Sequence, residues 1–248
     1  MLLKKCARVA AVLPPAFLHL VRGYWTIKTA FHRLDLSTQQ VRVQQWAMQL
    51  LRIANIALEV TGQPPADGPV LLVANHISWL DIVVLHAARH CRFVSKDDIK
   101  QWPLVGTLSD GSGTLYIKRE SSRDAHRMVQ TMAKRLRAGD ILAVFPEGTT
   151  GDGITLRHFH ANLLQAAIDA QTPVQAVALR FMDAATGTPT HAPRYADQDT
   201  LAGSIWRTLS APRIRVVVDY GAPQFAEGRN RREWAAALRS EIAAKLAG

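Results

Sequence analysis

Short apolar runs alternate with helix-like segments through the last three quarters of this 248-residue sequence. Residues 70–74 (VLLVA) and 141–145 (ILAVF) are continuous apolar runs with the length of a buried strand. Residues 124–138 repeat apolar side chains at helical spacing and stop before Gly139, a residue common just past helix ends. Further strands are expected at residues 92–94, 114–117, 174–179 and 214–220, and further helices near residues 161–170 and 231–246. This alternation predicts an α/β domain with a mixed, largely parallel sheet flanked by helices.

The first quarter of the chain is basic and apolar. Residues 1–60 hold eight lysines and arginines against two acidic residues, so they carry over half of the net charge of +10. The apolar run at residues 9–21 is interrupted by a Pro-Pro pair and is shorter than the roughly 20 residues of a membrane-spanning helix. Residues 43–58 repeat apolar side chains at helical spacing. We therefore expect residues 1–62 to form a helical module lying in the interface of an anionic membrane, followed by a second domain at residues 63–248.

A basic, apolar N-terminal segment also fits three other roles. A signal peptide would show small residues at a cleavage site, which the sequence after residue 18 (HLVRG) lacks. A helical hairpin could also pack on the domain without touching lipid. A strongly basic chain can bind nucleic acid, but here the charge accompanies apolar helices and no nucleic-acid motif is present, so no such partner is expected. Cys6 and Cys91 match no zinc spacing, so no metal is expected.

Polar residues follow three of the expected strands, where an α/β sheet collects its functional groups. His76 follows residues 70–74, Arg119 follows residues 114–117, and Glu147 follows residues 141–145. On a continuous helix, residues five apart are separated by about 140° around the axis, so His76 would not meet Asp81. The pair can meet if His76 lies in the turn before a helix that contains Asp81. Asp81 would then fix the imidazole tautomer and make His76 a general base. A histidine with this spacing to a carboxylate is more often a capping residue.

Four segments of the sequence resemble the motifs of a known family. NHISWLD at residues 75–81 matches the NHxxxxD motif of the glycerolipid acyltransferases, which include the 1-acylglycerol-3-phosphate acyltransferases. GTLYIKR (residues 113–119), FPEGTT (residues 145–150) and TPVQAVALRF (residues 172–181) are similar to the second, third and fourth blocks of that family. The four blocks appear in family order and cover roughly residues 65–185. The resemblance thus favours a catalytic pair over a capping histidine.

The resemblance implies the reaction and its partners. The acyl donor would be a thioester, either acyl-CoA or acyl carrier protein, with no other cofactor. His76 and Asp81 would be catalytic: His76 takes the proton of a lysophospholipid hydroxyl, which attacks the thioester without an acyl-enzyme. The acceptor would be 1-acylglycerol-3-phosphate and the product phosphatidate. Such an enzyme would be membrane-associated, monotopic or peripheral, at the cytoplasmic face of the inner membrane.

The resemblance also implies which residues bind the acceptor. Arg119 would bind its phosphate, because a guanidinium matches phosphate oxygens bidentately. Asn75, Glu147, Gly148 and Thr149 would complete the binding site, with Asn75 positioning the turn and Gly148 allowing close backbone approach. The sequence departs from the family pattern at residue 150, where threonine replaces the common arginine, and at residue 176, where alanine replaces a second proline. The acceptor headgroup is therefore open. FPEGTTGDG also resembles relatives that acylate lyso-ornithine lipid, so that lipid or another lysolipid is an alternative acceptor. A non-catalytic basic module that binds membranes or nucleic acid is the remaining alternative.

Overall fold

The computed structural model of this chain describes residues 2–117, 121–196 and 199–247. Its strands are β1 (Ile56–Thr61), β2 (Val70–Ala74), β3 (Arg92–Lys96), β4 (Leu115–Ile117), β5 (Ile141–Val144), β6 (Val174–Asp183) and β7 (Ile214–Gln224). Its α-helices are α1 (Leu2–Thr29), α2 (Leu36–Ile53), α3 (Leu80–Ala88), α4 (Pro103–Gly111), α5 (Ser122–Arg137), α6 (Gln165–Ala170), α7 (Leu201–Ser210) and α8 (Arg231–Ala247). Short 3-10 helices lie at Phe31–Arg33, Asp97–Gln101 and Ala161–Leu164.

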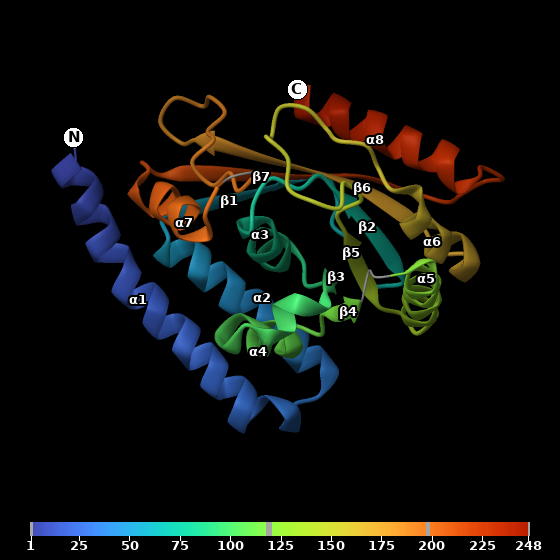
Figure 1. Cartoon of the computed structure of the whole chain (residues 1–248), viewed down its shortest axis with the longest axis horizontal. Coiled ribbons are helices and arrows are strands. Elements are labelled where there is room, and N and C mark those ends of the chain that lie inside the picture. Colours follow the sequence, from blue (N-terminus) through green and yellow to red (C-terminus); the bar gives the residue numbers. More distant parts are fainter. Residues whose placement is uncertain (1, 118–120, 197–198, 248) are drawn as a thin grey trace.

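The described strands form one seven-stranded sheet in the order β1-β7-β6-β2-β5-β3-β4. Strands β6 and β7 pair antiparallel, and every other neighbouring pair of the described sheet is parallel. The predicted mixed, largely parallel sheet is therefore confirmed. Strand β2 lies between β5 and β6, so its carboxyl end is at the middle of the sheet edge (Figure 1).

Both faces of β2 are buried, which explains its continuous apolar sequence. Leu72 and Ala74 point to a core shared with α2 and α3, whereas Leu71 and Val73 point to a core shared with α5 and α8. The expected layer of helices on each face of the sheet is therefore present (Figure 1). A strand enclosed in this way is rigid, so the turn that follows it starts from a fixed point.

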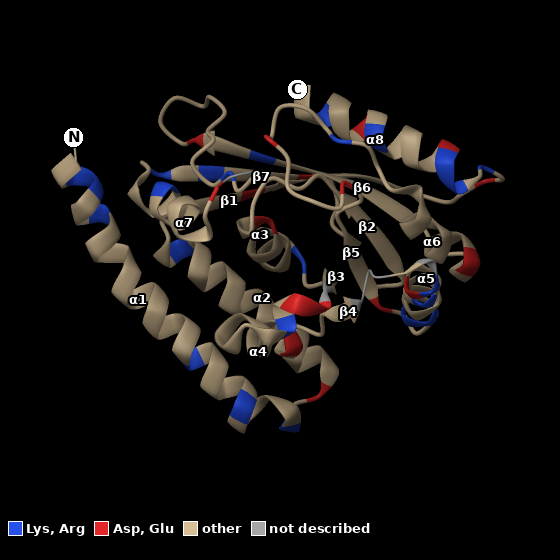
Figure 2. Cartoon of the chain, viewed as in Figure 1, with Lys and Arg blue, Asp and Glu red and all other residues tan. Residues whose placement is uncertain are grey.

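The N-terminal segment forms two helices, as expected, but the first one differs from the prediction. Helix α1 runs without interruption through Pro14 and Pro15. It packs against α4 and α7, and Lys and Arg residues recur along it (Figure 2). Helix α2 belongs to the core, because Ala47 and Leu51 are buried there. Among the described residues, none of the helices is both long enough and apolar enough to cross a membrane.

The predicted end of the N-terminal module at residue 62 needs correction. The second helix stops at Ile53, and Asn55 turns the chain with a φ of 58°. Residues Ile56–Thr61, expected to continue the helix, form β1 instead and pair in parallel with β7. The division into residues 1–62 and 63–248 therefore cuts through the sheet. Apolar residues at positions 56–58 fit a half-buried strand as well as a helix, so periodicity could not separate the two.

Candidate active site

The turn that contains His76 connects β2 to α3. Strand β2 ends at Ala74, and α3 begins at Leu80, which leaves residues 75–79 as an irregular turn at the carboxyl end of the sheet. Asp81 stands in the first turn of α3, where the helix dipole favours a negative charge. The turn thus brings a histidine and a carboxylate to the edge where α/β proteins place their sites.

His76 and Asp81 are in direct contact. Nδ1 of His76 lies 2.8 Å from Oδ2 of Asp81, and the Asp81 side chain is fully buried while that of His76 is 17% exposed. The same Asp81 oxygen accepts hydrogen bonds from the backbone N–H groups of Ile77 (2.6 Å) and Ser78 (2.8 Å). Because a carboxylate only accepts, the proton of the neutral imidazole sits on Nδ1 and leaves Nε2 as a proton acceptor. The predicted contact is present, and it is the geometry that a general base needs.

The plane of the His76 ring is fixed by a neighbouring aromatic side chain. The Phe145 ring stacks on it with centroids 3.9 Å apart and planes 9° apart. Phe93 in turn stacks on Phe145, with centroids 5.6 Å apart. Phe145 opens the FPEGTT block and Phe93 lies in β3, so strand β3 and the loop after β5 together hold the imidazole.

The backbone of His76 is held by the loop after β5. Oε1 of Glu147 accepts a hydrogen bond from the His76 N–H (2.8 Å), and the Gly151 N–H donates to the His76 carbonyl (2.7 Å). The other Glu147 oxygen accepts from the Arg157 N–H (2.8 Å). Burial raises the pKa of Glu147, and these two N–H donors oppose that effect. Both oxygens of Glu147 thus have backbone partners, while its predicted contact with an acceptor hydroxyl stays a prediction.

Asn75 was predicted to bind substrate and to position the turn, and its amide group is engaged within the protein. Its side chain is buried, its amide nitrogen donates to the Leu179 carbonyl (3.1 Å), and its amide oxygen accepts from the Leu179 N–H (2.8 Å). Asn75 therefore ties the end of β2 to β6. That Asn75 positions the turn, and that it contacts substrate, both stay predictions.

Three other residues were predicted to bind the acceptor: Gly148, Thr149 and Arg119. Gly148 adopts a φ of 73°, a left-handed conformation that favours glycine, and Thr149 is exposed beside it. Arg119, the predicted phosphate ligand, lies outside the described residues. Thr150, which stands where the family pattern has arginine, is partly buried.

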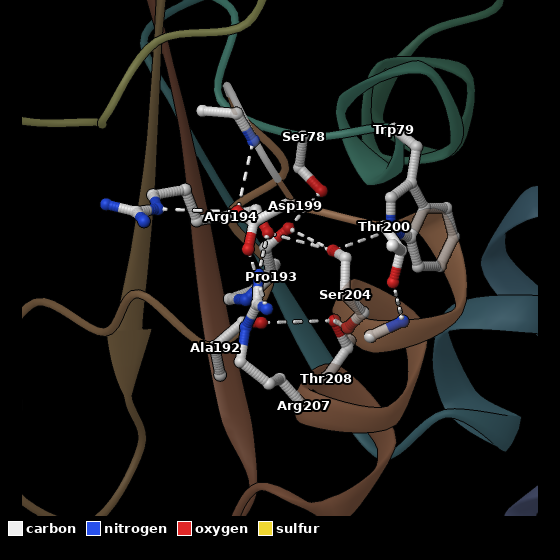
Figure 3. A network of polar contacts seen from close by, with 12 residues as sticks. Ser78, Trp79, Ala192, Pro193, Arg194, Asp199, Thr200, Ser204, Arg207 and Thr208 are labelled. Atoms are coloured by element: carbon white, nitrogen blue, oxygen red, sulfur yellow. Dashed lines mark hydrogen bonds and ion pairs between the residues drawn. The ribbon is translucent and has the colours of Figure 1, made fainter.

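Sequence patterns missed a second segment that contacts the turn. The Tyr195 N–H donates to the Ile77 carbonyl (3.0 Å), and the Ser78 hydroxyl donates to the Pro193 carbonyl (Figure 3). Ser78 is itself part of NHISWLD, but no signal in the sequence points from it to a partner 115 positions away.

The three residues His86, His90 and Cys91 pack at the end of α3, as the sequence suggested. All three are buried, and burial lowers the pKa of His86 to about 3 and that of His90 to about 4. Burial also raises the pKa of Cys91, which removes its thiolate character. The described residues contain no cluster of side chains suited to hold a metal ion.

Comparisons with known proteins agree on the family. A family model described as Acyltransferase matches residues 55–180. A 1-acyl-sn-glycerol-3-phosphate acyltransferase of Neisseria gonorrhoeae is 40% identical over 172 residues, which are 68% of this chain and 66% of the relative. A lyso-ornithine lipid O-acyltransferase of Pseudomonas aeruginosa is 32% identical over 248 residues, 99% of this chain and 95% of the relative. The crystal structure of a 1-acyl-sn-glycerophosphate acyltransferase of Thermotoga maritima has a TM-score of 0.67, with 18% identity, and covers 99% of this chain and 94% of that one. That structure supports the fold.

Proposed function

Because this chain belongs to the glycerolipid acyltransferase family, we propose that it transfers a fatty acyl group from a thioester to the free hydroxyl of 1-acylglycerol-3-phosphate, giving phosphatidate. The observation that carries the proposal is the 2.8 Å contact between Nδ1 of His76 and the buried Asp81 carboxylate. It leaves Nε2 of a partly exposed imidazole free of a proton at the open end of β2. The name of the Neisseria relative supports the acceptor.

The reaction follows from this arrangement. Nε2 of His76 takes the proton of the acceptor hydroxyl while its oxygen forms a bond to the thioester carbonyl carbon. Asp81 stabilises the positive charge that the imidazole then carries. When the tetrahedral intermediate collapses, the carbon–sulfur bond breaks and the thiolate leaves with the proton from His76. A thiol has an ordinary pKa near 8.5, so its thiolate is a good leaving group and no covalent acyl-enzyme is required.

The identity of the donor is part of the proposal. The thioester would be acyl-CoA or acyl carrier protein, and no further cofactor enters the reaction. Purified protein incubated with 1-acylglycerol-3-phosphate and each labelled donor separately should form labelled phosphatidate with at least one of them. Formation of free fatty acid without phosphatidate would contradict the transfer step.

A specific residue favours a second acceptor. Thr150 stands where the family pattern has a phosphate-binding arginine, and the lyso-ornithine lipid enzyme of Pseudomonas aeruginosa covers nearly the full chain. The alternative function is therefore acylation of lyso-ornithine lipid by the same chemistry. A panel of lysolipids assayed at equal concentration separates the two, because kcat/KM ranks acceptors by transition-state binding. A preference for the phosphate-free acceptor would replace the first proposal with the second.

We further propose that α1 holds the enzyme at an anionic membrane surface, on the cytoplasmic face of the inner membrane. Phe17 and Trp25 are 61% and 59% exposed on α1, which carries several lysines and arginines but no acidic residue. Exposed aromatic side chains next to cations suit the interface of an anionic bilayer. Removing residues 1–60 is a poor test, because it would also remove β1 and the core residues of α2.

Point substitutions test this membrane proposal better. The full chain with Phe17→Glu and Trp25→Glu should no longer sediment with phosphatidylglycerol vesicles at low salt, while a Phe225→Glu control should still do so. Phe225 is also an exposed aromatic residue, but it lies after β7, away from α1. Equal sedimentation of the double variant and the control would contradict the proposed role of α1.

A further inference from the structure

The turn that carries His76 is held on one side by a segment far away in sequence. The Tyr195 N–H bonds to the Ile77 carbonyl at 3.0 Å, and the Ser78 hydroxyl bonds to the Pro193 carbonyl. Ile77 and Ser78 are also the two residues whose N–H groups bind the Asp81 carboxylate. Residues 191–196 therefore hold the backbone that sets the position of the general base and its partner.

One residue of α7 joins this segment to the turn. Ser204 is fully buried, and its Oγ accepts a hydrogen bond from Nε1 of Trp79, at 3.1 Å. The same Oγ lies 2.9 Å from the Arg194 carbonyl and 3.2 Å from the Pro193 carbonyl, and it has one proton to donate to either. The Pro193 carbonyl is thus within reach of two buried hydroxyls, one from the turn and one from α7 (Figure 3).

Other residues of α7 also hydrogen-bond to the segment that contacts the turn, so this segment has a fixed position relative to Ser204. Arg207 donates to Asp199 (2.9 Å) and to the Arg194 carbonyl (2.6 Å). The Thr208 hydroxyl donates to the Ala192 carbonyl at 3.4 Å (Figure 3). These bonds fix the carbonyls of residues 192 and 194, on either side of Pro193, relative to α7.

Resting on the proposed function, we propose that Ser204 is a positioning residue for the His76–Asp81 pair. It acts through the Trp79 indole and the Pro193 carbonyl and touches no reacting atom. Replacing its hydroxyl by a hydrogen, as alanine does, leaves the indole N–H of the half-buried Trp79 without its partner and removes one restraint on the turn. Small displacements of a general base are costly, because proton transfer requires hydrogen-bond geometry.

The test compares Ser204→Ala with Ser210→Ala in the full-length protein. Ser210 is a buried serine of the same helix whose hydroxyl bonds to the Arg207 carbonyl within α7, so it is a matched control. We expect Ser204→Ala to lower kcat about tenfold, with the KM for the lysolipid unchanged within about twofold. Ser210→Ala should keep the kcat of the unmodified protein. Trp79→Phe, which keeps the contact of Ser204 with Pro193, should lower kcat by no more than this factor, and the double variant Trp79→Phe with Ser204→Ala should be no slower than Ser204→Ala alone.

A substrate-independent readout separates this inference from the proposed function. The NMR signal of the Nδ1 proton of His76 reports its bond to Asp81, and it should move in Ser204→Ala and stay in place in Ser210→Ala. If the unmodified protein acylates none of the tested lysolipids, the proposed function fails and this signal alone decides the inference. An unmoved signal in Ser204→Ala, or equal changes in both serine variants, would overturn the positioning role.

Discussion

Replacing Asp81 by asparagine tests the electrostatic part of the mechanism. The substitution keeps the shape of the side chain, and the amide oxygen can still accept from the Ile77 and Ser78 N–H groups. What it removes is a negative charge 2.8 Å from the His76 ring. At an effective dielectric constant of about 20, that charge stabilises the imidazolium by about 6 kcal/mol. Losing all of it corresponds to a fall in kcat of about 10⁴-fold.

The assay for Asp81→Asn is steady-state acyl transfer with both substrates varied. We expect KM to change little, because Asp81 is fully buried and does not reach the acceptor. The free energy of unfolding should fall by about 1–3 kcal/mol, since the new amide N–H₂ takes the place of an oxygen that is buried without a hydrogen-bond partner. Asp140→Asn is the control: Asp140 is a buried carboxylate that pairs with Arg92 (3.1 Å), and its loss should lower stability and leave kcat unchanged. A kcat of Asp81→Asn within tenfold of the unmodified protein would refute the reasoning.

Two buried titratable groups, His86 and Glu147, give further predictions. His86 is buried and neutral with its pKa lowered to about 3, so below pH 6.5 the unfolded chain binds a proton that the folded chain excludes, and stability falls as the pH falls. Between pH 7 and pH 5 the free energy of unfolding should fall by about 2 kcal/mol because of His86. Chemical unfolding of a His86→Leu variant should show a fall smaller by that amount. An equal fall in the variant and the unmodified protein would contradict this role of His86. Glu147→Gln leaves one oxygen for two backbone donors, so we expect kcat to fall about tenfold or more and the free energy of unfolding to fall by about 1–3 kcal/mol. Unchanged values in both measurements would show that the loop after β5 does not position His76.

The sheet and the contact between His76 and Asp81 could be predicted from local signals. The buried run of β2 and the helical spacing before Gly139 each arise from neighbours in the chain, and both elements are present. The meeting of His76 and Asp81 depends on a turn of five residues, which a family motif can encode. Local patterns could therefore place the pair without knowledge of the rest of the fold.

Residues whose role depends on distant partners could not be predicted. Asn75 bonds to Leu179, 104 positions away, so its amide ties the end of β2 to the backbone of β6. Ser204 meets Trp79 across 125 positions, and no motif surrounds it. The change from α2 to β1 depends on the left-handed conformation of Asn55, which leaves no periodic signal in the sequence.

Turnover of the His76→Ala variant tests the role of the general base most directly. The full-length variant should bind anionic vesicles and unfold like the unmodified protein, yet form phosphatidate, or the acylated form of whichever lysolipid the protein prefers, at no more than a few per cent of its rate. If the alanine variant retained a tenth or more of that rate with intact fold and vesicle binding, another group would be accepting the proton.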